Sequence, residues 1–171
     1  DGLTRPELRQ VPGVAKNGVI AASHAELGAR WLYVEGDAPL LFTENETNNE
    51  RIFRTANAAP YVKDGIDNAI VHGVTSAVNP RHMGTKAAAH YELPVPPGGT
   101  IALRLRLGPR QLTATEAFGP EFDSVLSAGL READAFYGRV IPAGVSADET
   151  AVMRQAFAGM LWSKQFYHYV V

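Results

Sequence analysis

The sequence predicts a mixed fold, β then α, in which an antiparallel β-sandwich portion is followed by two helices. Up to about Phe118, clusters of Gly, Pro, Asn and Asp separate short runs rich in Val, Ile, Leu and Tyr, which is typical of an all-β region. After Gly119 and Pro120 the repeat of apolar residues changes from every second residue to about every 3.6 residues, which is the period of an α-helix. With 171 residues, 46% of them hydrophobic, the chain can bury a core without disulfides or a metal.

Three short apolar runs predict strands in the first part of the chain. They cover residues 19–22, 30–34 and 40–43. Residues 36–39, Gly-Asp-Ala-Pro, fit a turn between the last two. Between Asn57 and His82 the prolines and glycines leave room only for a short helix or strand near residues 66–71.

A β-hairpin is predicted over residues 90–107. In its second arm, four apolar residues alternate with Arg104 and Arg106, so the arginines are expected on the outer, solvent-facing side. These apolar residues are Ile101, Leu103, Leu105 and Leu107. Residues 96–99, Pro-Pro-Gly-Gly, suit a tight reversal. Pro94 has no N–H for a ladder, so the first arm is expected to be an edge strand or to end there.

Two helices are predicted after Pro120. The first is amphipathic, runs for about five turns to Val140 and is stopped by Pro142. The second starts at Ser146 with a capping box formed with Glu149. Its apolar residues cover more than one face, so we expect it to be buried on several sides.

The C-terminal helix is followed by a group of large aromatic side chains. Left exposed, they would form an apolar patch that monomers rarely tolerate. We therefore expect the remainder of a longer parent polypeptide, or another fragment, to pack on this helix. The first residue is Asp1 and not Met, which agrees with a chain cut from something longer.

Composition argues against several partners. The net charge is −2, so no basic excess is present to neutralise phosphates, and nucleic acid is not expected as a partner. No apolar run approaches the roughly 18 residues of a membrane span, so no membrane partner is expected. Cysteine is absent and no signal peptide is visible, which favours a cytoplasmic location.

Two polar segments could carry chemistry. Residues 44–50 gather acids and amides that could hold Ca²⁺ or a sugar, but their spacing does not match the known Ca²⁺ loop, and a solvated loop is favoured. The polar residues from Lys63 to Asn68 could build a binding site or fasten their loop to a neighbour, and the second reading is favoured.

The five histidines are dispersed with no metal-binding spacing, so neither a metal nor a cofactor is predicted.

Aromatic residues near the C-terminus are the candidates for substrate binding. Trp162, Tyr167 and Tyr169 could stack on sugar rings. Their spacing also fits a core or interface stripe, which is the favoured interpretation.

Four segments of the chain resemble large bacterial proteins related to the mannosyl-oligosaccharide glucosidases, glycoside hydrolase family 63 and its clan. The segments are residues 41–48, 60–66, 79–91 and 159–169. In that family a β-sandwich, a helical linker and an (α/α)6 barrel follow one another. The resemblance implies that residues 1–118 belong to the sandwich, 119–145 to the linker and 146–171 to the start of the barrel.

The resemblance also implies an inverting α-glucosidase-like enzyme acting on oligosaccharides. Such chemistry needs two carboxyl groups held about 6.5–9.5 Å apart. In the family both belong to the barrel, and we expect them beyond Val171, so no catalytic residue is assigned in this chain. The segment would then have a scaffolding or substrate-gating role.

Two other readings remain open. The chain could be a non-catalytic carbohydrate-binding or structural β-sandwich module. It could also be a complete small enzyme with a site around Glu46, Asp64 and His72.

Overall fold

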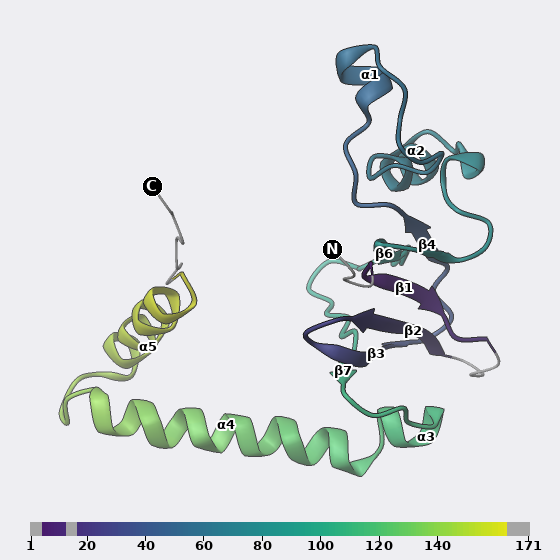
Figure 1. The fold of residues 1–171 in the computed structure, drawn as a ribbon. Helices are drawn as coiled ribbons and strands as arrows, with labels where there is room; N and C mark the ends of the chain where they lie inside the picture. The colour runs from purple at the N-terminus through teal and green to yellow at the C-terminus, as the bar shows by residue number, and fades with distance from the viewer. Residues whose placement is uncertain (1–4, 13–16, 164–171) are drawn as a thin grey trace. The chain divides into compact units, whose positions relative to one another are not determined.

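The computed structural model describes residues 5–12 and 17–163 (Figure 1). It divides the chain into two compact units, Asp1–Pro120 and Glu121–Val171. The first unit holds antiparallel sheets, and the second holds helices. The predicted order of an antiparallel β region followed by helices is therefore confirmed.

The described residues of the first unit form two sheets. The larger has five strands in the order β5-β1-β2-β3-β7, and the smaller pairs β4 with β6. Every pairing in both sheets is antiparallel. The strands are β1 (Glu7–Gln10), β2 (Asn17–His24), β3 (Gly28–Glu35), β4 (Leu40–Thr43), β5 (Met83–Gly84), β6 (Lys86–Ala89) and β7 (Leu105–Gly108). The unit also contains the short helices α1 (Asn49–Phe53), α2 (Gly65–Val71) and α3 (Ala114–Ala117) and a 3-10 turn, η1 (Thr75–Ala77).

The five-stranded sheet buries side chains on both faces. On one face Val19 and Tyr33, which are register partners on β2 and β3, pack with Leu112 and Ala117. The Tyr33 hydroxyl accepts a hydrogen bond from the Leu112 N–H at 2.5 Å and lies 3.2 Å from the Leu112 carbonyl oxygen. This bond ties the segment before α3 to the centre of the sheet.

The other face packs against the two-stranded sheet. Ile20 and Val34 of the large sheet are buried together with Leu40 and Phe42 of β4. Alternation along the strands explains the division, because neighbouring residues in a strand point to opposite faces. The three predicted strands match β2, β3 and β4, and the predicted short element near residues 66–71 is the helix α2.

The predicted hairpin over residues 90–107 is wrong. Residues 90–104 contain no strand, and β7 pairs with β3, where Leu105 lies opposite Val34 and Leu107 opposite Leu32. A turn does form, with the Gly99 N–H donating to the Pro96 carbonyl at 2.9 Å. Pro94 has no N–H to give to a ladder and interrupts the first arm, and the second arm pairs instead with the long strand β3.

The faces of β7 also differ from the prediction. The leucines at 105 and 107 are 55% and 66% exposed, whereas Arg104 and Arg106 are half-buried. The arginines are held by carbonyls and a carboxylate of the same unit. Arg106 donates to the Glu116 carbonyl at 3.2 Å, and Arg104 donates to Glu35. Hydrogen bonding, and not solvent exposure, therefore decides the orientation of this strand.

The second unit contains the two predicted helices, α4 (Pro120–Val140) and α5 (Ala147–Trp162). The predicted capping box is present: the Ser146 hydroxyl accepts from the Glu149 N–H at 3.2 Å, and the Glu149 carboxylate accepts from the Ser146 N–H at 2.8 Å. Arg154 of α5 forms an ion pair with Asp134 of α4 at 2.6 Å and lies over the Tyr137 ring. These contacts join the two helices.

The predicted burial of the C-terminal helix on several sides is not found. Neither α4 nor α5 has a buried residue in the part of the chain that the structure describes. Within those same ranges, no helix has both the length and the apolar character needed to cross a bilayer.

Candidate functional site

The two polar segments singled out in the sequence lie side by side. The Glu44 N–H donates to the Tyr61 carbonyl at 2.8 Å, and the Lys63 N–H donates to the Glu46 carbonyl at 3.0 Å. The Lys63 ammonium donates to the Thr47 hydroxyl at 3.1 Å. The segment that leaves β4 is therefore fastened to the segment that enters α2.

Asn48 is at the centre of this arrangement. Its amide nitrogen donates to both carboxylate oxygens of Asp64, at 3.1 and 3.2 Å. Its amide oxygen accepts from the Arg51 N–H and from the Asn57 side chain, both at 3.1 Å. Arg51 also forms an ion pair with Asp64 at 3.2 Å. We call Asn48, Arg51, Asn57 and Asp64 the amide cluster; all four line a pocket of about 360 Å³.

Arginine also holds the two acids nearest to β4. Arg5 donates to Glu44 at 2.9 Å and to Glu46 at 2.7 Å, and the Thr85 hydroxyl donates to Glu44 at 2.7 Å. These carboxylates and Asp64 therefore act as acceptors that fasten loops. The geometry fits the favoured interpretation of the segment from Lys63 to Asn68, which was expected to fasten its loop. Residues 44–50, which were expected to form a solvated loop, are the segment to which it is bonded.

The structure separates two of the residues proposed for a small enzyme. Asp64 is the N-cap of α2 and His72 is its C-cap. The seven residues of α2 lie between them, so the two caps are roughly 12 Å apart along the axis. Glu46, the third residue of that reading, is paired with Arg5. Within residues 5–12 and 17–163, no group of three or more His, Asp or Glu side chains could hold a metal ion.

An apolar groove lies on the face of the large sheet that packs against β4 and β6. Its volume is about 610 Å³. Ile20, Leu32 and Val34 contribute to its floor, which continues onto β7 through Leu105 and Leu107. On the other side it is lined by three consecutive residues of β6. We call this feature the β6 groove.

Glu35 and Arg104 form an ion pair at the end of β3, close to Tyr91. The Arg104 Nε–H donates to Glu35 at 2.8 Å, and a second guanidinium N–H donates to the other carboxylate oxygen. This hydrogen bonding lowers the pKa of Glu35. The Tyr91 hydroxyl donates to the Glu35 carbonyl at 2.5 Å, and burial, followed by the charge of Glu35, raises the pKa of Tyr91.

Sequence reasoning missed this Glu35 site. The available signal was the alternation of leucine and arginine over residues 103–107, which identified a strand but led us to place the arginines in solvent.

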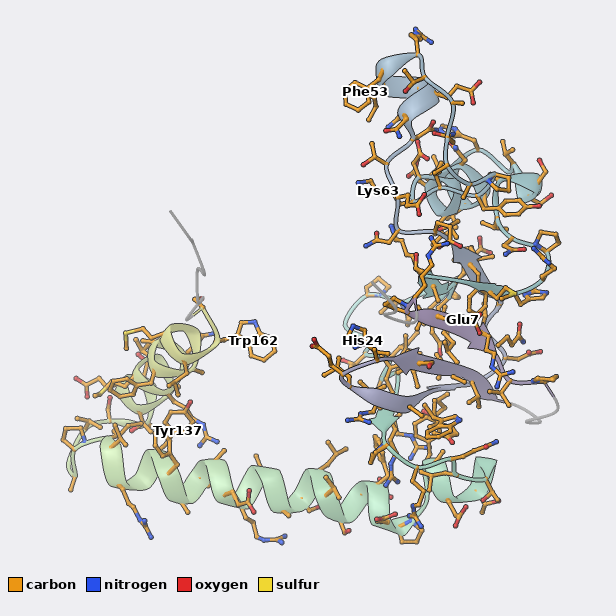
Figure 2. All side chains as sticks on the ribbon, in the orientation of Figure 1. Glu7, His24, Phe53, Lys63, Tyr137 and Trp162 are labelled. Atoms are coloured by element: carbon orange, nitrogen blue, oxygen red, sulfur yellow. The ribbon has the colours of Figure 1, made fainter. Side chains whose placement is uncertain are left out.

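The aromatic candidates for substrate binding are not brought together in the described part of the chain. Trp162 is 92% exposed at the end of α5, and its side chain stands clear of the helix (Figure 2). Tyr167 and Tyr169 lie outside the described residues.

Comparison with known proteins identifies a relative in Saccharomyces cerevisiae, the uncharacterized protein YMR196W. It is 37% identical over 144 residues, which are 78% of this chain and 13% of the yeast protein. The chain thus matches only about an eighth of the length of that relative. No family model matches the chain. No solved structure matches it.

Proposed function

We propose that the chain is a non-catalytic segment of a larger glycoside hydrolase, similar to family 63 and its clan, which hydrolyses α-glucosidic bonds of oligosaccharides with inversion. Its role is to form a scaffold or to gate the substrate. The proposal comes from the sequence resemblance. The observation that carries the segment reading is that α4 and α5 are regular helices, yet none of their described residues is buried.

Exposed apolar side chains on both helices support a role as packing elements. On α4, Val125, Leu126 and Leu130 are 61%, 59% and 62% exposed. On α5, Met160 and Leu161 are 64% and 63% exposed. Surfaces of this kind are rare on isolated soluble domains and are normally covered by other protein. In the proposal α4 is the linker and α5 is the first barrel helix. The small share of the yeast relative that the chain matches agrees with this role.

The hydrogen bonding of four acidic side chains in this chain supports placing the two catalytic carboxyl groups elsewhere in the parent polypeptide. A general acid must carry a proton near neutral pH, so its pKa has to be raised. Arg104 lowers the pKa of Glu35, and the oxygens of Glu44, Glu46 and Asp64 accept hydrogen bonds within the fold. These acids suit structural roles.

Trp162 favours the alternative function, a carbohydrate-binding module without catalysis. An indole that is 92% exposed is available to stack on a sugar ring. In either case the partner is an oligosaccharide.

We further propose a cytoplasmic location, because the chain has no cysteine.

The test is hydrolysis of α-linked gluco-oligosaccharides by the polypeptide encoded by the complete gene and by this chain alone. Proton NMR of the first product identifies its anomer. We expect the complete polypeptide to release the β-anomer and this chain to release nothing. Turnover by this chain, or an α-anomer from the complete polypeptide, would contradict the proposal. Oligosaccharide binding that is lost in Trp162→Ala, without hydrolysis by either protein, would favour the binding module.

A further inference from the structure

We propose that the β6 groove binds an extended β-strand supplied by another part of the parent polypeptide. The strand pairs with the free edge of β6 and places alternate apolar side chains on the floor of the groove. This inference rests on the proposed segment role of the chain but does not require glycosidase activity.

The floor of the groove has the pattern that a strand requires. Leu103, Leu105 and Leu107 all line the groove, and they follow the alternation that puts residues on one face of a sheet. They are 46%, 55% and 66% exposed, although the neighbouring strands β2 and β3 bury Ile20 and Val34 on the same face. The apolar face is therefore covered near β4 and left open toward β7.

The wall of the groove is the edge of a strand. Ala87, Ala88 and Ala89 all line it, although successive side chains point to opposite faces. An edge that faces the groove accounts for this, because the side chains of Ala87 and Ala89 pack against the core while Ala88 still reaches the groove. In the described part of the chain, β6 pairs with β4 alone, so its second edge has no strand beside it.

Register identifies the backbone groups on that free edge. Leu41 is opposite Ala88 in the ladder, and the His90 N–H donates to the Pro39 carbonyl at 3.0 Å in the same register. In an antiparallel pair, residues alternate between bonding to the partner and pointing away from it. Ala88 therefore bonds to β4, and the N–H and C=O groups of Ala87 and Ala89 point to the free edge.

An extended strand is the occupant that both buries the leucines of the groove floor and bonds to the backbone edge of β6. A helix would cover the leucines but leave the backbone groups of Ala87 and Ala89 unpaired, at a cost comparable to a lost hydrogen bond each. A strand bonds to the edge and buries alternate side chains on the floor, which is the known mode of recognition by strand addition. The yeast relative extends far beyond the matched region and thus has ample sequence to supply such a strand.

The experiment compares hydrogen exchange at the amides of Ala87 and Ala89 in this chain and in the complete polypeptide. Strand pairing should slow both amides by at least about a hundredfold in the complete polypeptide, while the amide of Ala88, already bonded to β4, changes less. Equal exchange in the two proteins would overturn the proposal. Protection already present in this chain together with a dimeric mass would assign the groove to a second copy and overturn it as well.

A pair of matched variants tests the floor. In the complete polypeptide, Leu105→Lys should raise exchange at Ala87 and Ala89 about tenfold, because the charge is placed under the docked strand. Ile52→Lys changes an apolar residue of similar exposure on α1, 52% against 55%, and should leave these two amides unchanged. The same effect from both variants would mean general destabilisation and would reject strand docking. If the complete polypeptide hydrolyses no oligosaccharide but still protects the amides of Ala87 and Ala89, the glycosidase proposal alone is rejected.

Discussion

Gly65 shows how one residue can fix the position of a helix. It opens α2 and is buried, and a Cβ added there would lie 2.2 Å from the Ala77 carbonyl oxygen. Such a contact is impossible without movement of the backbone, so η1 would have to separate from α2. The glycine therefore lets these two elements approach closely.

We expect Gly65→Ala to reduce the free energy of unfolding by about 1–3 kcal/mol, the usual range for overpacking. Urea denaturation followed by circular dichroism measures the change. Gly108→Ala is the matched control, because nothing lies within 4 Å of a Cβ added there. If Gly65→Ala is no less stable than Gly108→Ala, the close approach of α2 and η1 does not constrain the fold.

The ion pair of Glu35 and Arg104 should make stability depend on pH. The pKa of Glu35 is lowered from its ordinary value of 4.5 in the folded chain. The pair therefore stabilises the fold fully above about pH 5, and this contribution is lost as the pH falls through the lowered folded pKa. Glu35→Gln should flatten the dependence of unfolding free energy on pH between about 5 and 3.

The control for this prediction is a thermodynamic cycle. Arg104→Met should flatten the pH dependence of the unfolding free energy over the same range. The double variant should lose no more of this pH dependence than either single variant. Additive losses in the double variant would mean that Glu35 owes its low pKa to groups other than Arg104.

At the scale of elements, the start of α5 depends on its capping box. Ser146 and Glu149 satisfy each other's backbone N–H groups, and the hydrogen bond from the Ser146 N–H lowers the pKa of Glu149. Ser146→Ala should destabilise the helix by about 1 kcal/mol. Hydrogen exchange at the amides of residues 148–150 should be faster by about fivefold to tenfold. Ser146→Thr keeps the hydroxyl and should retain slow exchange; similar exchange in both variants would show that the cap does not hold this turn.

Elements with a regular local pattern were predictable. Residues 30–34 and 40–43 are mostly apolar and rich in large side chains, and residues 120–140 have a helical period that ends before Pro142. The strand β6 was not predictable from its sequence. Lys-Ala-Ala-Ala has no strand preference, and only pairing with β4 makes it a strand.

The candidate site was predictable only in its parts. The sequence marked both polar segments, but the hydrogen bonds between Asn48 and Asp64 join residues 16 positions apart and depend on how the chain turns between them. The pairing of β7 with β3 joins residues far apart in the sequence, as Leu105 and Val34 show. Local propensity contains no information about such partners, which is why the arginines of this strand were placed on the wrong side.

At the scale of the whole molecule, the helices α4 and α5 should contribute packing surface to the parent protein without stabilising this chain. Leu130→Lys should change the unfolding free energy of the 171-residue chain by less than about 0.5 kcal/mol, because Leu130 is 62% exposed. In the complete polypeptide the same change should cost several times more, because the charge would be buried without a partner. Thermal unfolding of both proteins gives the comparison.

Arg131→Ala serves as the matched control for Leu130→Lys, since it alters the neighbouring exposed residue of α4. It should have little effect in either protein. An equal and small effect of Leu130→Lys in the two proteins would argue that this face of α4 stays in solvent.

The open leucines of β7 also bear on how the protein is synthesised. In our proposal a strand covers these leucines. Until that strand has docked, a nascent chain presents an apolar floor beside a strand edge, the combination that leads to intermolecular β-pairing. We expect ribosome-associated or holdase chaperones to bind this region during translation, and recombinant production of the isolated chain to yield more soluble protein at low temperature, where hydrophobic association weakens. The leucines that the proposed strand covers thus set the period of greatest risk during biosynthesis.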